Sequence, residues 1–193
     1  MTGKIMAIAA HPGDGMFTMG ATLAKQIERG GKGVLLSLSL GEKGAPKNIP
    51  VKQYGEMQRA ATEKSVRLLG AEAVFLTYPD AEIPFNEESS LAVCDVIREH
   101  MPDIIVTHWN GSWHKDHQNC HLIVHDAIFY AALGTLERKL PPHSAGRSSE
   151  ILFCDTICPP FAIDSARTLV HAGSAPNASH AFSRSARLAN GMK

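Results

Sequence analysis

Short apolar runs alternate along the chain with longer stretches whose apolar residues stand three and four positions apart. A short apolar run between turn residues is typical of a buried strand, and the longer spacing is typical of an amphipathic helix. The runs predict strands over residues 4–10, 34–40, 73–77, 103–108 and 150–155. The stretches between them predict helices over residues 14–30, 53–69, 87–100 and 116–133.

The alternation of these elements predicts the fold class. Strands that are apolar throughout are buried on both faces, and strands joined through helices pair in parallel. We therefore expect an α/β protein, a three-layer sandwich with a mostly parallel sheet covered by helices on both faces. In the first predicted helix, the apolar residues at helical spacing are Phe17, Ala21, Ala24 and Ile27.

Composition narrows the class of protein. The chain has 193 residues, of which 44% are hydrophobic, enough for one core. Lys and Arg number 19, as do Asp and Glu, so no overall basic charge favours nucleic acid or an anionic membrane as a partner. The apolar run before His11 is too short for a signal peptide or a membrane helix, and we expect a cytoplasmic protein. No CxxC pair occurs, and we expect reduced, mostly buried thiols at Cys94, Cys120, Cys154 and Cys158.

The composition changes near residue 161. Residues 1–161 carry the strand and helix pattern and are predicted to form one domain. Residues 162–193 are rich in Ala, Ser, His and Arg and lose apolar periodicity. We interpret them as an atypical tail, either flexible or packed at an interface with another subunit.

Polar clusters stand where the first and fourth predicted strands end. One is HPGD at residues 11–14, and the other runs over residues 108–117. Parallel sheets place their sites outside the carboxyl ends of strands, where strand order reverses. Two histidines and one carboxylate form a common catalytic zinc set with a position open for water or substrate. His11, Asp14 and His117 fit that set.

These segments resemble two motifs of one family. AHPGDG resembles the AHPDDE motif, and HKDH resembles the HPDH motif, of the LmbE/PIG-L family of zinc-dependent N-acetylglucosaminyl deacetylases. The resemblance covers roughly residues 3–160, and the two motifs together are specific although either alone is weak. It implies a Rossmann-like fold and a metal ion, Zn²⁺ or another divalent ion such as Fe²⁺, held by His11, Asp14 and His117.

The resemblance also implies catalytic roles and a reaction. His114 would act as an acid or oxyanion stabiliser, and Asp116 would tune the neighbouring imidazole. The reaction would be removal of the acetyl group from an N-acetylated amino sugar or a similar small amide, through metal-assisted amide hydrolysis. The expected partner is this small molecule, with no nucleic acid and no membrane, and family members commonly form homo-oligomers.

The chain also departs from the family motifs. Gly13 stands where the motif has the aspartate thought to be the general base, and Gly15 stands where it has glutamate. The family's Arg-x-x-Glu pair is matched here by Gln58 and Ala61, which carry neither group. We therefore expect a weakened deacetylase, or one that recruits Asp116 or a substrate group as base. The alternative is a noncatalytic metal- or sugar-binding member of the same fold.

Simpler interpretations exist for several of these histidines. His11 and Asp14 could cap the helix that follows them, without any metal. His114 could be only a loop residue. His121 and His125 stand at helical spacing with His117 and could make an HxxxH metal pair, but the glutamate of HExxH is missing, and packing or solvent exposure is the favoured interpretation.

Loop residues near the second motif have two interpretations each. His108 and Asn110 could orient a metal ligand through a hydrogen bond or be without a role. Trp109 and Trp113 could form a stacking wall for a sugar ring or be ordinary packing residues. Residues 41–48 could be a lid, although a plain surface loop is the simpler interpretation. Nucleotide binding is a weaker hypothesis, because no GxGxxG or GxxxxGK[ST] motif follows the first strand.

Overall fold

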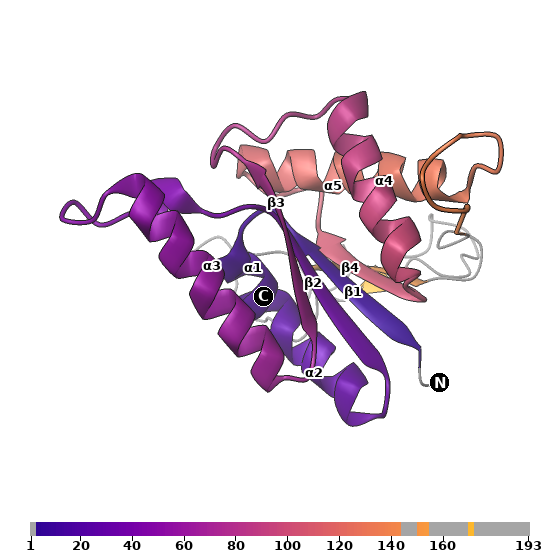
Figure 1. The fold of residues 1–193 in the computed structure, drawn as a ribbon, viewed down its shortest axis with the longest axis horizontal. Coiled ribbons are helices and arrows are strands. Elements are labelled where there is room, and N and C mark those ends of the chain that lie inside the picture. The colour runs from indigo at the N-terminus through magenta and orange to yellow at the C-terminus, as the bar shows by residue number, and fades with distance from the viewer. Residues whose placement is uncertain (1–2, 144–149, 155–169, 172–193) are drawn as a thin grey trace, which may run out of the picture.

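The computed structural model describes residues 3–143, 150–154 and 170–171 of the chain (Figure 1). Within them, one sheet has the strand order β3-β2-β1-β4-β5-β6. Strands β1 to β5 pair in parallel, and β6 pairs antiparallel with β5. The strands are β1 (Lys4–Ala9), β2 (Lys32–Ser39), β3 (Glu72–Tyr78), β4 (Ile104–His108), β5 (Glu150–Cys154) and β6 (Val170–His171).

Helices cover both faces of this sheet, which confirms the predicted three-layer α/β fold (Figure 1). Helices α2 and α3 lie on one face, and α4 and α5 lie on the other (Figure 1). The helical segments are α1 (Pro12–Asp14), a π-helical turn (Gly15–Met19), α2 (Gly20–Glu28), a 3-10 turn (Glu42–Gly44), α3 (Val51–Leu68), α4 (Glu87–His100) and α5 (Lys115–Ala132).

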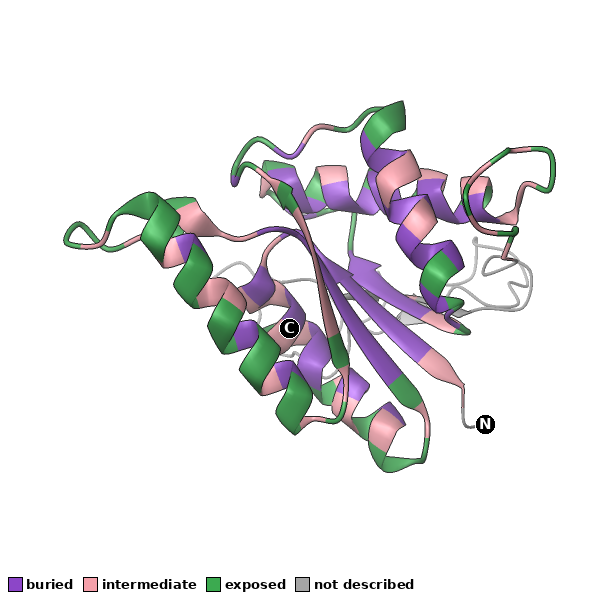
Figure 2. Cartoon of the chain, viewed as in Figure 1, coloured by how far each residue is buried: buried purple, intermediate pink, exposed green. Residues whose placement is uncertain are grey.

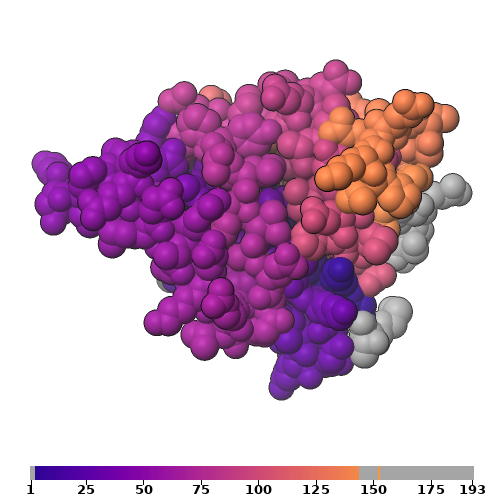
Figure 3. All heavy atoms as spheres, in the orientation of Figure 1, coloured from indigo at the N-terminus to yellow at the C-terminus, as the bar shows by residue number. Residues whose placement is uncertain are grey.

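The core lies on both sides of the central strands, because successive side chains of a strand point to opposite faces. In β1, Met6 and Ile8 pack with α4 and α5, whereas Ile5 and Ala7 pack with α2 and α3. Figure 2 shows buried residues along most of β1, β2 and β4. In Figure 3 the magenta part of the chain, between about residues 50 and 100, covers most of the visible face.

The region predicted as one helix over residues 14–30 is the main correction to the predicted elements. It consists of α1, the π-helical turn and α2. Phe17, from the predicted apolar set, is 91% exposed, whereas Met19 and Leu23 are fully buried against the sheet. A π-helical turn holds more residues than an α-helical turn, so a 3.6-residue period starting at Phe17 selects the wrong face.

The strand order reverses between β1 and β4, as the positions of the two polar clusters predicted. β1 leads through β2 to β3 on one side, and β4 leads to β5 on the other. β1 and β4 are adjacent, with Ile5 paired to Ile104. Sites of parallel sheets occur at this kind of crevice. The residues that follow β1 and β4 therefore meet at one edge of the sheet.

Some predictions from composition fall partly outside the described residues. Cys94 and Cys120 are buried and belong to no disulfide, as expected, but the side chain of Cys154 and all of Cys158 lie outside the described part. The predicted tail over residues 162–193 also lies outside it, apart from β6. Among the described helices, none is both long and apolar enough to cross a membrane.

Candidate metal centre

The end of β1 brings two polar side chains together. His11 has an extended backbone, and Pro12 starts the short helix α1 directly after it. One helical turn places Asp14 on the same side, so that the Nδ1 atom of His11 lies 2.8 Å from Oδ2 of Asp14. The two motif residues thus face each other over the edge of the sheet.

The third residue comes from the other side of the crevice. His117 lies in the first turn of α5, which follows β4, and its side chain is almost completely buried. Its Nε2 atom lies 3.0 Å from the same Oδ2 atom of Asp14. The donor atoms of His11, Asp14 and His117 all lie within 4.8 Å of one another, close enough to hold one metal ion. We call these three residues the metal group.

Each histidine of the metal group has a partner on its outer nitrogen. Nδ1 of His117 lies 3.1 Å from the hydroxyl oxygen of Ser112, and Nε2 of His11 lies 3.0 Å from Oδ1 of Asp80. Metal-binding histidines usually donate their other N–H group in this way, which fixes the ring orientation and the tautomer. The arrangement directs the inner nitrogens of both rings at the carboxylate of Asp14.

The capping interpretation of His11 and Asp14 is wrong. His11 is the N-cap of α1, and Asp14 precedes the π-helical turn, but neither side chain makes a capping hydrogen bond. Both side chains are engaged in the metal group instead. His114, the possible loop histidine, does cap a helix: its Nδ1 atom accepts the backbone N–H of Asp116 at 3.2 Å.

The electrostatics of the metal group favour an ionised carboxylate. Burial raises the pKa of the Asp14 carboxyl, but the hydrogen bonds from His11 and His117 outweigh burial and hold this pKa well below its usual range. Burial lowers the pKa of His11, but the carboxylates of Asp14 and Asp80 outweigh that effect and raise it to about 10. The site therefore concentrates negative charge around His11, as a cation site requires.

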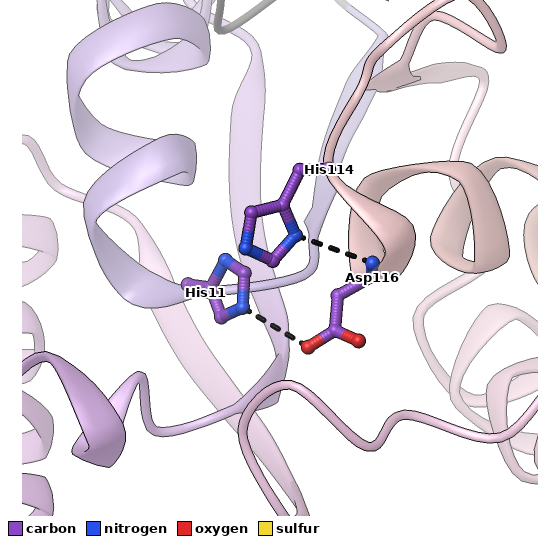
Figure 4. Close-up of side chains that lie close together, drawn as sticks. All are labelled: His11, His114 and Asp116. Atoms are coloured by element: carbon purple, nitrogen blue, oxygen red, sulfur yellow. Dashed lines mark hydrogen bonds and ion pairs between the residues drawn. The ribbon is translucent and has the colours of Figure 1, made fainter.

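A second group of three potential ligands shares His11 (Figure 4). Figure 4 shows the carboxylate of Asp116 and the ring of His114 beside His11. Oδ2 of Asp116 lies 3.3 Å from Nε2 of His11, so the second group uses the outer nitrogen and the metal group uses the inner one. An imidazole that binds a metal through one nitrogen keeps its proton on the other. Asp116 and His114 therefore serve best as partners of a ligand.

Asp116 reaches a different imidazole from the one adjacent to it in sequence. Its Oδ2 atom faces His11 and also accepts the backbone N–H of Ala81 at 2.7 Å. Its Oδ1 atom is buried without a hydrogen-bond partner. The predicted tuning role of Asp116 stays a prediction, and the histidine best placed to receive it is His11.

His11 and Asp14 of the metal group line a cavity of about 410 Å³. Its other walls come from Gly13, from the loop residues Gly41, Lys43 and Gly44, from Tyr54 and Gln58 of α3, from the turn 80–81 and from His114. Gly13 and Gln58 thus line the cavity at two of the positions where the family motifs carry charged residues. The predicted lid over residues 41–48 contributes a wall, and part of it is a 3-10 turn.

His108 lies directly beneath the metal group. Its ring is fully buried and stacks on that of His117, with 4.1 Å between centroids and 15° between planes. Its Nε2 atom accepts the N–H of Ala10 at 3.0 Å, which ties the end of β4 to the end of β1. Burial lowers the pKa of His108 to about 3, so the ring is neutral. Asn110, its predicted companion, is exposed.

Other predicted residues surround the cavity or lie away from it. The ring of Trp113 is 5.8 Å from that of His114 and 73% exposed, but neither Trp113 nor Trp109 lines the cavity, so sugar stacking stays a prediction. His121 and His125 belong to neither ligand group among the described residues. Their rings lie 4.6 Å apart on α5.

Asp80 and Ser112 were not predicted as site residues, because neither belongs to a recognised motif. Asp80 follows β3, and the carboxyl ends of parallel strands lie at the same edge of a sheet. A search for polar residues after every predicted strand, including the edge strand, would have found it. No comparable signal marks Ser112, whose role depends on how the loop before α5 folds.

Comparison with known proteins decides the family. Residues 6–128 match the family model described as PIG-L: GlcNAc-PI de-N-acetylase. The chain belongs to the PIG-L family. This confirms the resemblance carried by the two motifs at residues 10–15 and 114–117.

Curated PIG-L relatives are longer than this chain. Diacetylchitobiose deacetylase of Thermococcus kodakarensis is 28% identical in an alignment of 153 residues that covers 73% of this chain and 57% of that protein. A 1D-myo-inositol 2-acetamido-2-deoxy-alpha-D-glucopyranoside deacetylase of Corynebacterium diphtheriae is 26% identical in an alignment of 149 residues that covers 63% of this chain and 51% of that protein. The chain thus spans little more than half the length of these relatives.

Solved structures share the fold. N,N'-diacetylchitobiose deacetylase from Pyrococcus horikoshii superimposes with a TM-score of 0.72 at 22% identity, over 78% of this chain and 59% of that one. GalB, the 4-carboxy-2-hydroxymuconate hydratase from Pseudomonas putida, has a TM-score of 0.71 at 18% identity, over 78% and 65%. Because a deacetylase and a hydratase have this fold, the reaction must be argued from the site.

Proposed function

We propose that this PIG-L chain is a metal-dependent amidohydrolase that removes the acetyl group from an N-acetylated amino sugar of the N-acetylglucosamine type, or from a similar small amide. The convergence of His11, Asp14 and His117, the first two of which line the cavity, carries this proposal. The deacetylases among the curated relatives support the substrate class. A homo-oligomeric assembly and a cytoplasmic location stay predictions.

The donor set fits a catalytic divalent ion. Two imidazole nitrogens and one carboxylate are typical of zinc hydrolases, and non-haem Fe²⁺ uses the same combination. When bound, Zn²⁺ would polarise an acetyl carbonyl and lower the pKa of water from about 15.7 toward about 7. His11 and His117 would hold the ion through the nitrogens that face Asp14, and their outer nitrogens lie beside Asp80 and Ser112.

His114 is suited to stabilise the oxyanion that amide hydrolysis develops. Its Nδ1 atom accepts a backbone N–H, so the neutral ring carries its proton on Nε2, which is directed toward His11 (Figure 4). Burial and the neighbouring His117 and His11 lower the pKa of His114, which favours this neutral form. An N–H donor on the cavity wall matches the needs of a developing oxyanion.

The cavity lacks the family's base at Gly13. Asp116, which we considered as a substitute, is fully buried and does not line the cavity. A positioned general base typically adds about 10²- to 10⁴-fold to the rate. We therefore propose a slow deacetylase. Gln58 places a neutral amide where the family motif has arginine, so contacts to the substrate would differ from those of members that keep that residue.

A noncatalytic binding member is the second candidate. Gly13 and Gln58 both line the cavity, so the two departures fall on the surface that a substrate would touch. Such a protein would keep the metal group and bind a sugar or amide without turnover. The deacetylase and the binding member are both expected to bind the metal, and only the deacetylase is expected to turn over a substrate.

Release of primary amine from a panel of N-acetylated sugars and small amides tests the proposal. The Zn²⁺-loaded wild type is compared with His117→Ala and with His125→Ala, which removes an exposed histidine of the same helix outside the metal group. We expect release by the wild type and by His125→Ala, and none by His117→Ala. If a folded, metal-loaded wild type releases no amine from any compound of the panel, the result would favour the noncatalytic binding member.

A further inference from the structure

The turn after β3 reaches the metal group from two strands away. β3 is an edge strand separated from β1 by β2, yet Asp80 lies 3.0 Å from His11, through its Oδ1 atom and the Nε2 atom of the ring. Asp80 is only 8% exposed although it lies in a turn. Neither sequence motif contains this residue.

Asp80 is held on its other side by the loop that forms a cavity wall. Its Oδ2 atom accepts the backbone N–H of Lys43 at 2.9 Å, and its own N–H donates to Oε1 of Glu42 at 2.8 Å. Lys43 and Glu82 add an ion pair between the loop and the turn. The carboxylate of Asp80 therefore contacts both a metal-group histidine and the loop.

The next residue adds backbone strain to the same turn. Ala81 has a φ of 62°, a left-handed conformation that costs a residue with a side chain about 1–2 kcal/mol. Its N–H donates to Oδ2 of Asp116 at 2.7 Å, and this oxygen also faces His11. Strained backbone of this kind persists where the surroundings fix it, commonly at functional sites. Two consecutive residues thus support the outer side of His11.

We propose that Asp80 is a positioning residue of the metal centre. Its carboxylate accepts the N–H of Nε2 of His11, and this contact aims Nδ1 at the ion position beside Asp14. Such a carboxylate orients the ring and strengthens the nitrogen as a ligand. Asp80 is nearer to His11 than Asp116 is, and Asp116 shares its oxygen with Ala81.

The inference rests on the proposed metal centre and adds a structural link to it. Because one carboxylate contacts both His11 and the backbone of Lys43, the position of the ligand is coupled to the position of a cavity wall. Removal of Asp80 should therefore weaken metal binding, although Asp80 is no ligand in this arrangement.

The test measures the affinity of the metal-free protein for Zn²⁺ by competition with a chromophoric chelator. Asp80→Ala removes both contacts, and Asp80→Asn keeps the shape and an oxygen that can accept from His11. Glu82→Gln is the matched control, because it removes a carboxylate from the same turn that pairs with Lys43. We expect about 10- to 100-fold weaker binding for Asp80→Ala, a smaller loss for Asp80→Asn and no change for Glu82→Gln.

A spectroscopic readout separates positioning from general stability. The visible absorption of the Co²⁺-loaded protein reports ligand geometry, and we expect it to change in Asp80→Ala and to stay the same in Glu82→Gln. Wild-type affinity and spectrum in a folded Asp80→Ala would overturn the inference. If Asp80→Ala does not fold, Asp80→Asn decides in the same way.

This outcome is distinguishable from failure of the proposed reaction. A wild type that binds Zn²⁺ but releases no amine contradicts the proposed hydrolase and leaves the role of Asp80 to the affinity comparison. A wild type that binds no Zn²⁺ overturns both.

Discussion

The metal group and the substrate-facing wall of the same cavity match the family motifs to different degrees. His11, Asp14 and His117 all occupy their motif positions and converge on one point. On the wall, by contrast, Gly13 and Gln58 replace an aspartate and an arginine. Under the proposed function, metal binding would depend on the metal group, and rate and substrate choice would depend on the wall. Such a chain would keep the metal chemistry of the family and alter the substrate contacts.

The two glycines of the first motif sharpen this contrast. A Cβ atom at Gly13 would lie 3.8 Å from ring carbons of Phe17, an ordinary contact. A Cβ atom at Gly15 would lie 2.8 Å from Cδ1 of Leu35, which is fully buried in β2. Position 13, which lines the cavity, has room for a Cβ atom, whereas position 15, which faces the core, has none.

Restoring the carboxylate at position 13 should give the largest effect. We expect Gly13→Asp to raise turnover of an amide substrate by at least about tenfold, because a positioned base accelerates proton removal. Gly13→Asn is the control, since it has nearly the same shape and no basic group. Equal rates for the two variants and the wild type would contradict the idea that the missing carboxylate limits the enzyme.

A methyl group at position 15 should destabilise the fold. We expect Gly15→Ala to lower the free energy of unfolding by about 1–3 kcal/mol, because it overpacks the contact with Leu35. Gly13→Ala is the matched change two residues earlier in the same motif, and it should be neutral or slightly stabilising. Urea denaturation of both variants measures the difference. Equal losses of unfolding free energy in the two variants would contradict the claim that only position 15 is tightly packed.

A fall in pH should lower the stability of the fold through His108, the buried histidine that stacks on His117 of the metal group. The folded-state pKa of His108 is about 3, below its usual value near 6.5, so the unfolded chain takes up the proton first. Stability is thus complete above pH 6.5 and is lost as the pH falls toward 3. For the metal-free protein we expect a loss of about 2 kcal/mol between pH 6.5 and pH 5.

Denaturation at several pH values checks this prediction. Burial also lowers the pKa values of His114 and His121, which add to the loss with the same sign. His108→Gln should flatten the pH dependence, whereas His125→Gln, at an exposed position, should leave it unchanged. An unchanged slope in His108→Gln would contradict the assignment to His108.

Relief of the strained turn should give the smallest effect. Ala81→Gly removes the penalty of the left-handed conformation but adds freedom to the unfolded chain, so we expect a gain of up to about 1 kcal/mol. The N–H that donates to Asp116 is kept, and Zn²⁺ affinity should not change. Met101 is the other described residue that has a left-handed backbone and is not glycine, so Met101→Gly is the stability control. A destabilised Ala81→Gly would show that the methyl group itself is needed.

The sequence predicted most of the fold because its strands are short apolar runs with clear boundaries. α4 has the predicted limits, and the other long elements differ from prediction by a few residues. The face of the first helix was not predictable, because a π-helical turn interrupts the period that the prediction extrapolates. Local spacing cannot reveal such an interruption.

The site was predictable where the candidate ligands lie in segments that follow the central strands. His11 and Asp14 lie in the segment after β1, and His117 lies in the helix after β4, so their meeting follows from strand order. Asp80 and Ser112 act through turns whose paths depend on tertiary contacts. A search of strand ends would select Asp80 as a candidate, but sequence spacing shows neither its contact with His11 nor the contact of Ser112 with His117, so these contacts required the structure.

The central claim is that one ion binds on the inner nitrogens of His11 and His117 together with Asp14. A crystal of the Zn²⁺-loaded protein, with anomalous diffraction recorded at the zinc edge, tests it most directly. We predict one peak about 2.0–2.2 Å from Nδ1 of His11, Nε2 of His117 and an oxygen of Asp14. A peak at the outer nitrogen of His11, between His114 and Asp116, or no peak at all, would contradict the claim.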